Sequence, residues 1–152
     1  MKYEALLSEA DKQGIIVKEK KLKLREGLCC DNRIAINKNI ETTSKKTCVL
    51  AEELGHYHTT VGNILDLKDL RDIKQEKKAR NWAYEKLVGL VSIINAYEKG
   101  IKDKFDLAEY LDVTENFLDE AIEHYRQKYG VCYTIDHYAI YFEPNLGIMK
   151  MF

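Results

Sequence analysis

Three side chains that could carry out acid–base or metal chemistry stand together at residues 51–58, where the sequence reads Ala-Glu-Glu-Leu-Gly-His-Tyr-His. On a helix, Glu52 and His56 are four residues apart and share a face, as do Glu53 and His56 at three residues apart. Apolar residues lie on both sides of this segment. Burying a carboxylate or an imidazole is costly unless it is paired, hydrogen-bonded or bound to a metal. We therefore expect this cluster to bind a divalent cation.

The spacing is close to H-E-x-x-H, in which two histidines bind zinc and the glutamate beside the first is the general base. Glu52 stands at the position of the first histidine, so the motif here is E-E-x-x-H. A carboxylate can replace an imidazole because both bind zinc at about the same distance. The added negative charge should weaken the Lewis acidity of the metal or shift its preference from zinc toward manganese.

A third ligand must come from outside this helix, and Glu76 is the candidate. It stands near the start of a second long helix that the sequence predicts over residues 74–99, ended by Gly100. The spacing places Glu76 on the apolar stripe of that helix, whose members are Ala79, Ala83, Leu87, Leu90 and Ile94. The predicted site is therefore Glu52, His56 and Glu76 around one ion, with Glu53 as the general base.

The elements that must position these residues form an α+β pattern. Helical spacing of apolar residues predicts a short helix over 2–12, closed by Gly14, and a largely buried helix after the capping residues 42–44. Strands are predicted at 15–17, 22–24 and 34–37, with a turn at Asp31-Asn32 before the last. A small sheet should thus precede two long helices that pack together. A break at Gly62-Asn63 separates these helices.

The C-terminal third of the chain predicts two more helices and a hairpin. Asp106 and Thr114 are the candidate N-caps of helices over 107–111 and 115–129. Residues 131–142 are rich in β-branched and aromatic side chains and predict a hairpin with a turn at Asp136-His137. A second turn at 144–147 and an apolar tail follow. No internal repeat or linker interrupts the pattern, so one domain over residues 1–152 is expected.

Composition narrows the classes of partner and the compartment. The chain carries 24 Lys and Arg against 25 Asp and Glu, so no global field attracts it to nucleic acid or anionic lipid. The net charge does not exclude a local basic patch. The four cysteines lack C-x-x-C spacing and no secretory signal is visible, which favours reduced thiols in the cytoplasm. No apolar stretch approaches the ~20 residues that span a bilayer, so membrane insertion is not expected.

Three segments are similar to segments of the ImmA/IrrE family of metallopeptidases, a zincin-like group common in bacterial mobile elements. Leu50-Ala-Glu-Glu-Leu-Gly-His56 stands where the family has Leu-Ala-His-Glu-Leu-Gly-His. Residues 76–83, Glu-Lys-Lys-Ala-Arg-Asn-Trp-Ala, are similar to its Glu-x-x-Ala-Asn-x-Phe-Ala helix. Ile34-Ala-Ile-Asn37 matches its edge strand ahead of the active-site helix. The order and spacing of the three segments also fit.

The resemblance implies a zincin-like α+β fold, in which a small N-terminal sheet precedes an active-site helix packed on a second long helix, with C-terminal helices and a hairpin. It implies that His56 and Glu76 bind the metal and that Glu53 is the general base. It also implies an endopeptidase that cleaves or inactivates a helix-turn-helix repressor of a phage or mobile element. Glu52 departs from the family pattern, and E-E-L-G-H resembles a form of phage-type members.

Two other interpretations stay open. Glu52 in place of histidine favours a catalytically inactive binding module that keeps the fold and docks a regulator protein without metal. Residues 106–118 have the apolar spacing of a helix-turn-helix, but Glu115, Asp119 and Glu120 would repel phosphates. A packing or partner-docking role is therefore favoured over DNA binding for that segment.

For several other side chains we expect no part in catalysis or metal binding. His58 lies about 200° round the helix from His56 and is expected at the surface. Trp82 is expected in the core. Adjacent Cys29 and Cys30 would point to opposite sides of a strand, which suits packing better than joint metal binding.

Overall fold

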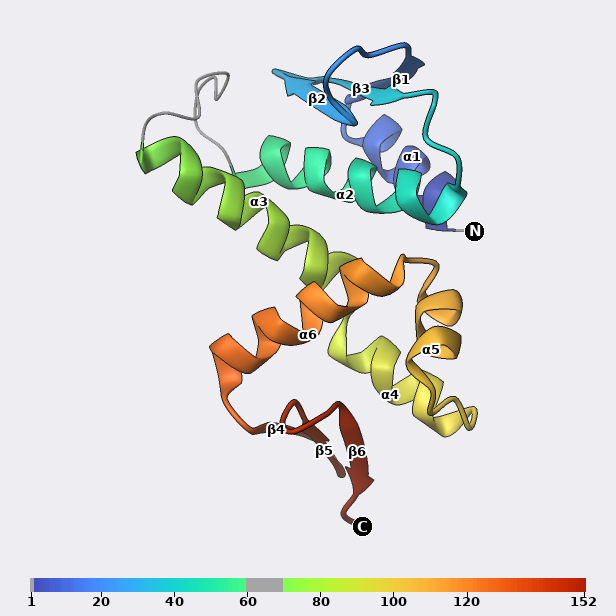
Figure 1. Cartoon of the computed structure of the whole chain (residues 1–152), viewed down its shortest axis with the longest axis vertical. Helices are drawn as coiled ribbons and strands as arrows, with labels where there is room; N and C mark the ends of the chain where they lie inside the picture. Colours follow the sequence, from blue (N-terminus) through green and yellow to red (C-terminus); the bar gives the residue numbers. More distant parts are fainter. Residues whose placement is uncertain (1, 60–69) are drawn as a thin grey trace. The chain divides into compact units, whose positions relative to one another are not determined.

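The computed structural model of the chain describes residues 2–59 and 70–152, with the backbone alone for residues 70–72. The chain divides into two compact units, Met1–Lys86 and Leu87–Phe152. Each unit has its own helices and its own three-stranded sheet (Figure 1). The predicted α+β class is confirmed, and one domain over residues 1–152 stays a prediction. None of the described helices is long and apolar enough to cross a membrane.

The N-terminal unit opens with α1 (Lys2–Lys12), an amphipathic helix that buries one face against the rest of the unit. It closes where predicted, because Gly14 adopts a φ of 76° that other residues rarely reach. The chain then forms a sheet in the spatial order β1 (Ile16–Lys20), β3 (Arg33–Asn37) and β2 (Gly27–Cys30). β3 pairs in parallel with β1 and antiparallel with β2.

The prediction of a strand at residues 22–24 is wrong. They lie in the loop between β1 and β2, which the side-chain amide of Asn37 holds through hydrogen bonds of 3.0 Å to the carbonyl oxygens of Leu22 and Arg25. Leu24 is 97% exposed, so the alternation of leucines and lysines belongs to a solvated loop. The missing strand is β2, which lacks the alternation of apolar and polar residues that marks a half-buried strand.

α2 (Thr43–Thr59) packs on α1 and on the sheet. Thr42 is its N-cap, since its Oγ1 accepts a hydrogen bond of 3.2 Å from the amide of Lys45. Residues 47–51 and 54–56 are buried, as predicted for a helix whose apolar residues extend almost all round it. The predicted break at Gly62-Asn63 lies outside the described residues.

The helix predicted over residues 74–99 is in fact two helices. α3 (Leu70–Leu87) ends before Gly89, which is the extended N-cap of α4 (Leu90–Glu98), with φ −69° and ψ 147°. The prediction was wrong because apolar residues continue at helical spacing through the break, so the pattern alone does not reveal it. The glycine inside the pattern was the available signal of a boundary.

The C-terminal unit continues with α5 (Lys104–Leu111) and α6 (Glu115–Tyr129). Thr114 caps α6 and Gly130 ends it, as predicted. The N-cap of α5 is Asp103 and not Asp106, because Oδ1 of Asp103 accepts a hydrogen bond of 2.9 Å from the amide of Phe105. Starting the helix at the earlier aspartate gains one further turn and leaves Asp106 inside the first turn.

The unit ends in an antiparallel sheet of β4 (Cys132–Ile135), β5 (Tyr138–Tyr141) and β6 (Gly147–Lys150). The predicted hairpin is β4 and β5, joined at Asp136-His137. The apolar tail predicted after the turn at 144–147 contains the third strand, β6, which was not predicted. Its pairing with β5 packs Ile148 against the core. The centre of that core is formed by Ile94, Tyr125, Tyr138, Ile140 and Phe142.

Candidate metal centre

α2 and α3 approach each other closely at Gly55. A methyl group built on Gly55 would lie 2.3 Å from the backbone oxygen of Ala79, so only a residue without a side chain allows this approach. The contact brings Nε2 of His56, on α2, to 3.1 Å from Oε2 of Glu76, on α3. The two helices thus pack together, as the sequence predicted.

His56 and Glu76 form a partly buried ion pair. Burial alone would lower the pKa of His56, but the hydrogen bond and the charge of Glu76, with the charges of Glu53 and Glu52, raise it. The hydrogen bond from His56 lowers the pKa of Glu76 against the effect of burial, and the positive charge of Arg80 acts in the same direction. Three carboxylates therefore create a negative potential around the imidazole, as a cation site requires.

Glu53 lies beside Gly27 of β2. A methyl group built on Gly27 would lie 2.9 Å from Cγ and 3.1 Å from Oε1 of Glu53, so the strand covers this side chain closely. Burial raises the pKa of Glu53 to about 7, the charge of Glu76 adds to the rise, and those of His56 and Arg25 oppose it. A carboxyl group with a pKa near neutrality can both accept and donate a proton at neutral pH.

Glu52 lies one turn before His56 on α2 and is half-buried. Its charge raises the pKa of both His56 and Glu53, so its carboxylate is within electrostatic reach of the pair. Among the residues that the structure describes, no group of three or more His, Cys, Asp or Glu side chains stands arranged to hold a metal ion. The fold thus brings His56 and Glu76 together with Glu53 nearby, and Glu52 would have to turn toward them.

The imidazole and carboxylate groups of the candidate site are donor types that bind divalent metals. Two of them, on His56 and Glu76, also have a suitable spacing. Imidazole and carboxylate are both zinc ligands, and tetrahedral coordination at about 2.1 Å separates two donor atoms by about 3.4 Å. The 3.1 Å between Nε2 of His56 and Oε2 of Glu76 is close to that separation. A cation could therefore bind between these two atoms with little movement of either helix.

Sequence reasoning missed residues that shape the surroundings of Glu53 and His56. Gly27 and Gly55 each permit a close backbone approach, and an isolated glycine within an element was the available signal. Cys29, on β2, lies near Glu53. Burial is the main cause that raises the pKa of its thiol to about 12, and the charge of Glu53 adds to the rise. Cys29 is half-buried and Cys30 is exposed, as expected for adjacent residues of a strand.

Trp82 is not the core residue that the sequence predicted. It is half-buried, and its ring stacks on that of His58 with 4.9 Å between centroids. His58 is exposed, as predicted. The reason is position, since Trp82 stands one residue before Ala83 and so lies off the buried stripe of α3.

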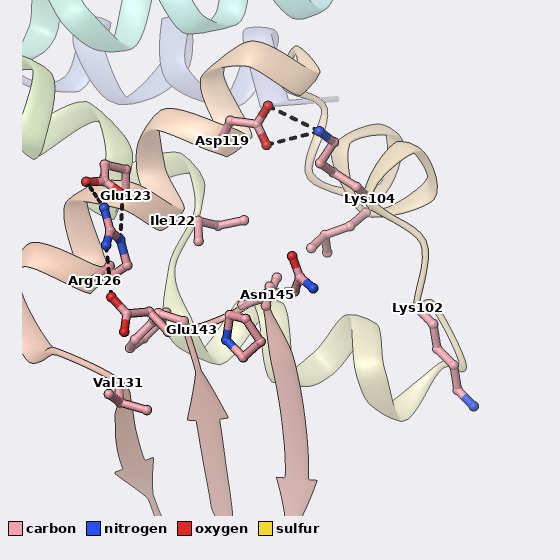
Figure 2. A pocket seen from close by; sticks show the side chains of 13 residues that line it. Lys102, Lys104, Asp119, Ile122, Glu123, Arg126, Val131, Glu143 and Asn145 are labelled. Carbon is pink, nitrogen blue, oxygen red and sulfur yellow. Dashed lines mark hydrogen bonds and ion pairs between the residues drawn. The ribbon is translucent and has the colours of Figure 1, made fainter.

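A concavity of about 1110 Å³ lies in the C-terminal unit, between α5, α6 and the segment after β5 (Figure 2). Five of its six charged lining side chains pair with one another, and Lys102 is the sixth. Lys104 lies 3.2 Å from Asp119, and Arg126 pairs with both Glu123 and Glu143. Because these five charges are paired within the protein, the candidate site remains the one in the N-terminal unit.

Comparison with protein families identifies the family of the chain. A family model described as Peptidase_M78, IrrE N-terminal-like domain, matches residues 10–123, which is three quarters of the chain. The matched segment contains α2, α3 and all four candidate site residues. The comparisons with curated proteins and with solved structures gave no match.

Proposed function

Because the chain belongs to the Peptidase_M78 family of IrrE N-terminal-like domains, we propose that it is a metal-dependent endopeptidase of ImmA/IrrE type. The observation that carries the proposal is the pair of donor atoms on His56 and Glu76, 3.1 Å apart, with the buried carboxyl group of Glu53 beside them. Glu52 is the proposed third ligand. Zinc is the proposed metal, and manganese is the alternative.

In the proposed reaction, His56, Glu76 and Glu52 hold the metal and Glu53 transfers the proton. When bound, the metal supplies a Lewis acid that polarises the scissile carbonyl group. Glu53 takes a proton from a water molecule as the water oxygen forms a bond to the peptide carbon. The same carboxyl group then gives this proton to the leaving nitrogen as the C–N bond breaks. The pKa of Glu53, about 7, suits both transfers.

The proposed substrate is a helix-turn-helix repressor of a phage or mobile element, cleaved in the cytoplasm so that repression ends. Membership of a peptidase family supports a protein substrate. The resemblance of E-E-L-G-H, at residues 52–56, to phage-type members supports the choice of repressor.

A Glu53→Gln variant tests the proposal, because an amide cannot accept the proton. We expect cleavage to fall by about 10²- to 10⁴-fold, while bound zinc is retained since all three ligands are unchanged. The measurement is mass spectrometry of a proteome-derived peptide library incubated with each zinc-loaded protein. Exposed Glu41, changed to Gln, is the matched control and should leave cleavage intact. Undiminished cleavage by Glu53→Gln would end the proposal.

A binding module without metal is the second candidate, and Glu52 at a histidine position favours it. The endopeptidase should gain thermal stability with zinc or manganese and lose it with a chelator, because a ligand of the folded state stabilises that state. The binding module should respond to neither addition.

A further inference from the structure

The N-terminal sheet has a second face, turned away from α2. Gly27 of β2 lies against α2, and its cross-strand partner Ile36 is fully buried. Side chains alternate along a strand, so the next residues point the opposite way. These are Leu28 of β2 and Ala35 of β3, which pair with each other, and Lys18 of β1, which pairs with Ala35. We call this the outer face.

A hollow of about 330 Å³ lies on the outer face. Its lining includes the apolar Ile16, Leu28 and Ala35 and the cationic Lys18, Lys20 and Arg33. None of the described residues that line it is acidic. Ile16 is 46% exposed, so apolar surface and like charges are both left in water. That combination is unfavourable in an isolated sheet and favours an interaction surface.

Two glutamates beside the strands of the sheet are engaged elsewhere. Glu19 of β1 points to the opposite face, where it accepts hydrogen bonds from Lys46 at 2.7 Å and from Tyr3 at 3.2 Å. Glu26 pairs with Lys45 at 3.2 Å. The positive charge of the outer face is therefore not neutralised by these two glutamates.

The basic surface continues into the loop after β1. Residues 21–26 read Lys-Leu-Lys-Leu-Arg-Glu, with three cations and one acid. Leu24 stands 97% exposed among them. The hydrogen bonds from Asn37 to the carbonyl oxygens of Leu22 and Arg25 hold this loop at the end of β3. The loop is thus a tethered extension of the sheet and carries the same charge.

We propose that the outer face and this loop dock an acidic segment of a protein partner. An aliphatic side chain of the partner fills the hollow between Ile16, Leu28 and Ala35, while flanking carboxylates meet Lys18 and Arg33. Charge complementarity selects the acidic segment, and the apolar centre selects one with aliphatic residues between its acids. The site lies on the face of the sheet opposite to Glu53, so binding needs neither metal nor catalysis.

Two other anionic partners fit less well. Duplex nucleic acid offers phosphates but no aliphatic group for the hollow, and a single strand stacks its bases on aromatic side chains, which are absent from the described lining residues. An anionic membrane is bound by protruding apolar groups. Leu24 of the loop is such a group, but the apolar centre formed by Ile16, Leu28 and Ala35 is concave.

The probe is a fluorescent synthetic peptide of alternating Glu and Leu, and its binding to the full chain is followed by fluorescence anisotropy. We expect the double variant Lys18→Glu, Arg33→Glu to bind at least about tenfold more weakly, because like charges then face each other. A peptide of alternating Glu and Ser should also bind more weakly than the Glu and Leu peptide. Ile16→Ser should reduce the difference in affinity between the two peptides, because it removes apolar surface from the hollow.

The matched control is the double variant Lys12→Glu, Lys102→Glu, which makes the same change in net charge at exposed lysines elsewhere. It should keep the wild-type affinity. Equal losses in both double variants, or equal binding of the two acidic peptides, would overturn the proposal. So would tighter binding of duplex DNA or phosphatidylserine vesicles through Lys18 and Arg33. Glu53→Gln should bind the peptide like the wild type, so this test stands apart from that of peptidase activity.

Discussion

At the scale of the residue, the surroundings of Glu53 define its chemistry. A glutamate in water has a pKa near 4.5 and is ionised at neutral pH, whereas burial raises the pKa of Glu53 to about 7. The cover comes from Gly27, whose missing side chain lets β2 lie directly over the carboxyl group. The pKa that suits Glu53 to its proposed role as general base therefore depends on a glycine in a neighbouring strand.

Glu19 gives a prediction on pH and stability at the same scale. The hydrogen bond from Lys46 lowers the pKa of Glu19 below 4.5 against the effect of burial, and the hydrogen bond from Tyr3 adds to it. A carboxyl group with a lowered pKa in the folded state stabilises that state above its unfolded pKa and loses this contribution as the pH falls. Lys46→Met should therefore lower the free energy of unfolding at neutral pH, by at most about 1 kcal/mol because the pair is partly exposed.

The difference between Lys46→Met and the wild type should shrink as the pH falls below about 4.5, toward the lowered pKa of Glu19. Urea unfolding at a series of pH values measures it. A difference that stays constant down to the acid transition would show that Lys46 stabilises the protein by packing and not by charge.

At the scale of the element, the crossing of α2 and α3 depends on Gly55. A methyl group there would lie 2.3 Å from the backbone oxygen of Ala79, and backbone cannot rotate aside as a side chain can. Gly55→Ala should push the helices apart, cost about 1 to 3 kcal/mol of stability and separate His56 from Glu76. Zinc affinity should fall with it, as measured by competition with a chromophoric chelator.

The matched control is Gly147→Ala, because a methyl group on Gly147 meets no atom within 4 Å. Its stability should stay within about 0.5 kcal/mol of the wild type. If Gly55→Ala were as stable as Gly147→Ala and bound zinc normally, the close crossing of α2 and α3 would not determine the site.

The elements predicted well from the sequence are those that local signals specify. α2 follows the cap Thr42, and α6 runs from Thr114 to Gly130. The elements that were predicted wrongly depend on contacts between segments that are distant in the sequence, or on a break that the local pattern does not show. β2 was missed because its pairing with β3 and its packing on α2, rather than its own pattern, make it a strand. The break at Gly89 was missed because an apolar stripe persists on both sides of it.

At the scale of the whole molecule, the near-zero net charge conceals two unlike units. The N-terminal unit holds 18 Lys and Arg against 14 Asp and Glu, and the C-terminal unit holds 6 against 11. Composition alone therefore could not reveal the cluster of cations on the outer face. Their clustering depends on the order of β1, β3 and β2 in the sheet, which no single segment encodes.

The candidate site shows the same division between local and non-local information. The motif at residues 52–56 and the stripe of α3 were enough to select Glu52, Glu53, His56 and Glu76. The approach of His56 to Glu76 follows from a helix crossing, and the burial of Glu53 follows from a strand that was not predicted. Metal binding by Glu52, His56 and Glu76 and the general-base role of Glu53 all stay predictions.

The central claim is that Glu52, His56 and Glu76 hold one divalent metal. Its most direct test is anomalous diffraction at the zinc edge from crystals of the protein grown with zinc. We predict one strong peak within about 2.0 to 2.2 Å of Nε2 of His56 and of carboxylate oxygens of Glu76 and Glu52. An intact pair of His56 and Glu76, with zinc bound elsewhere or not at all, would contradict the claim.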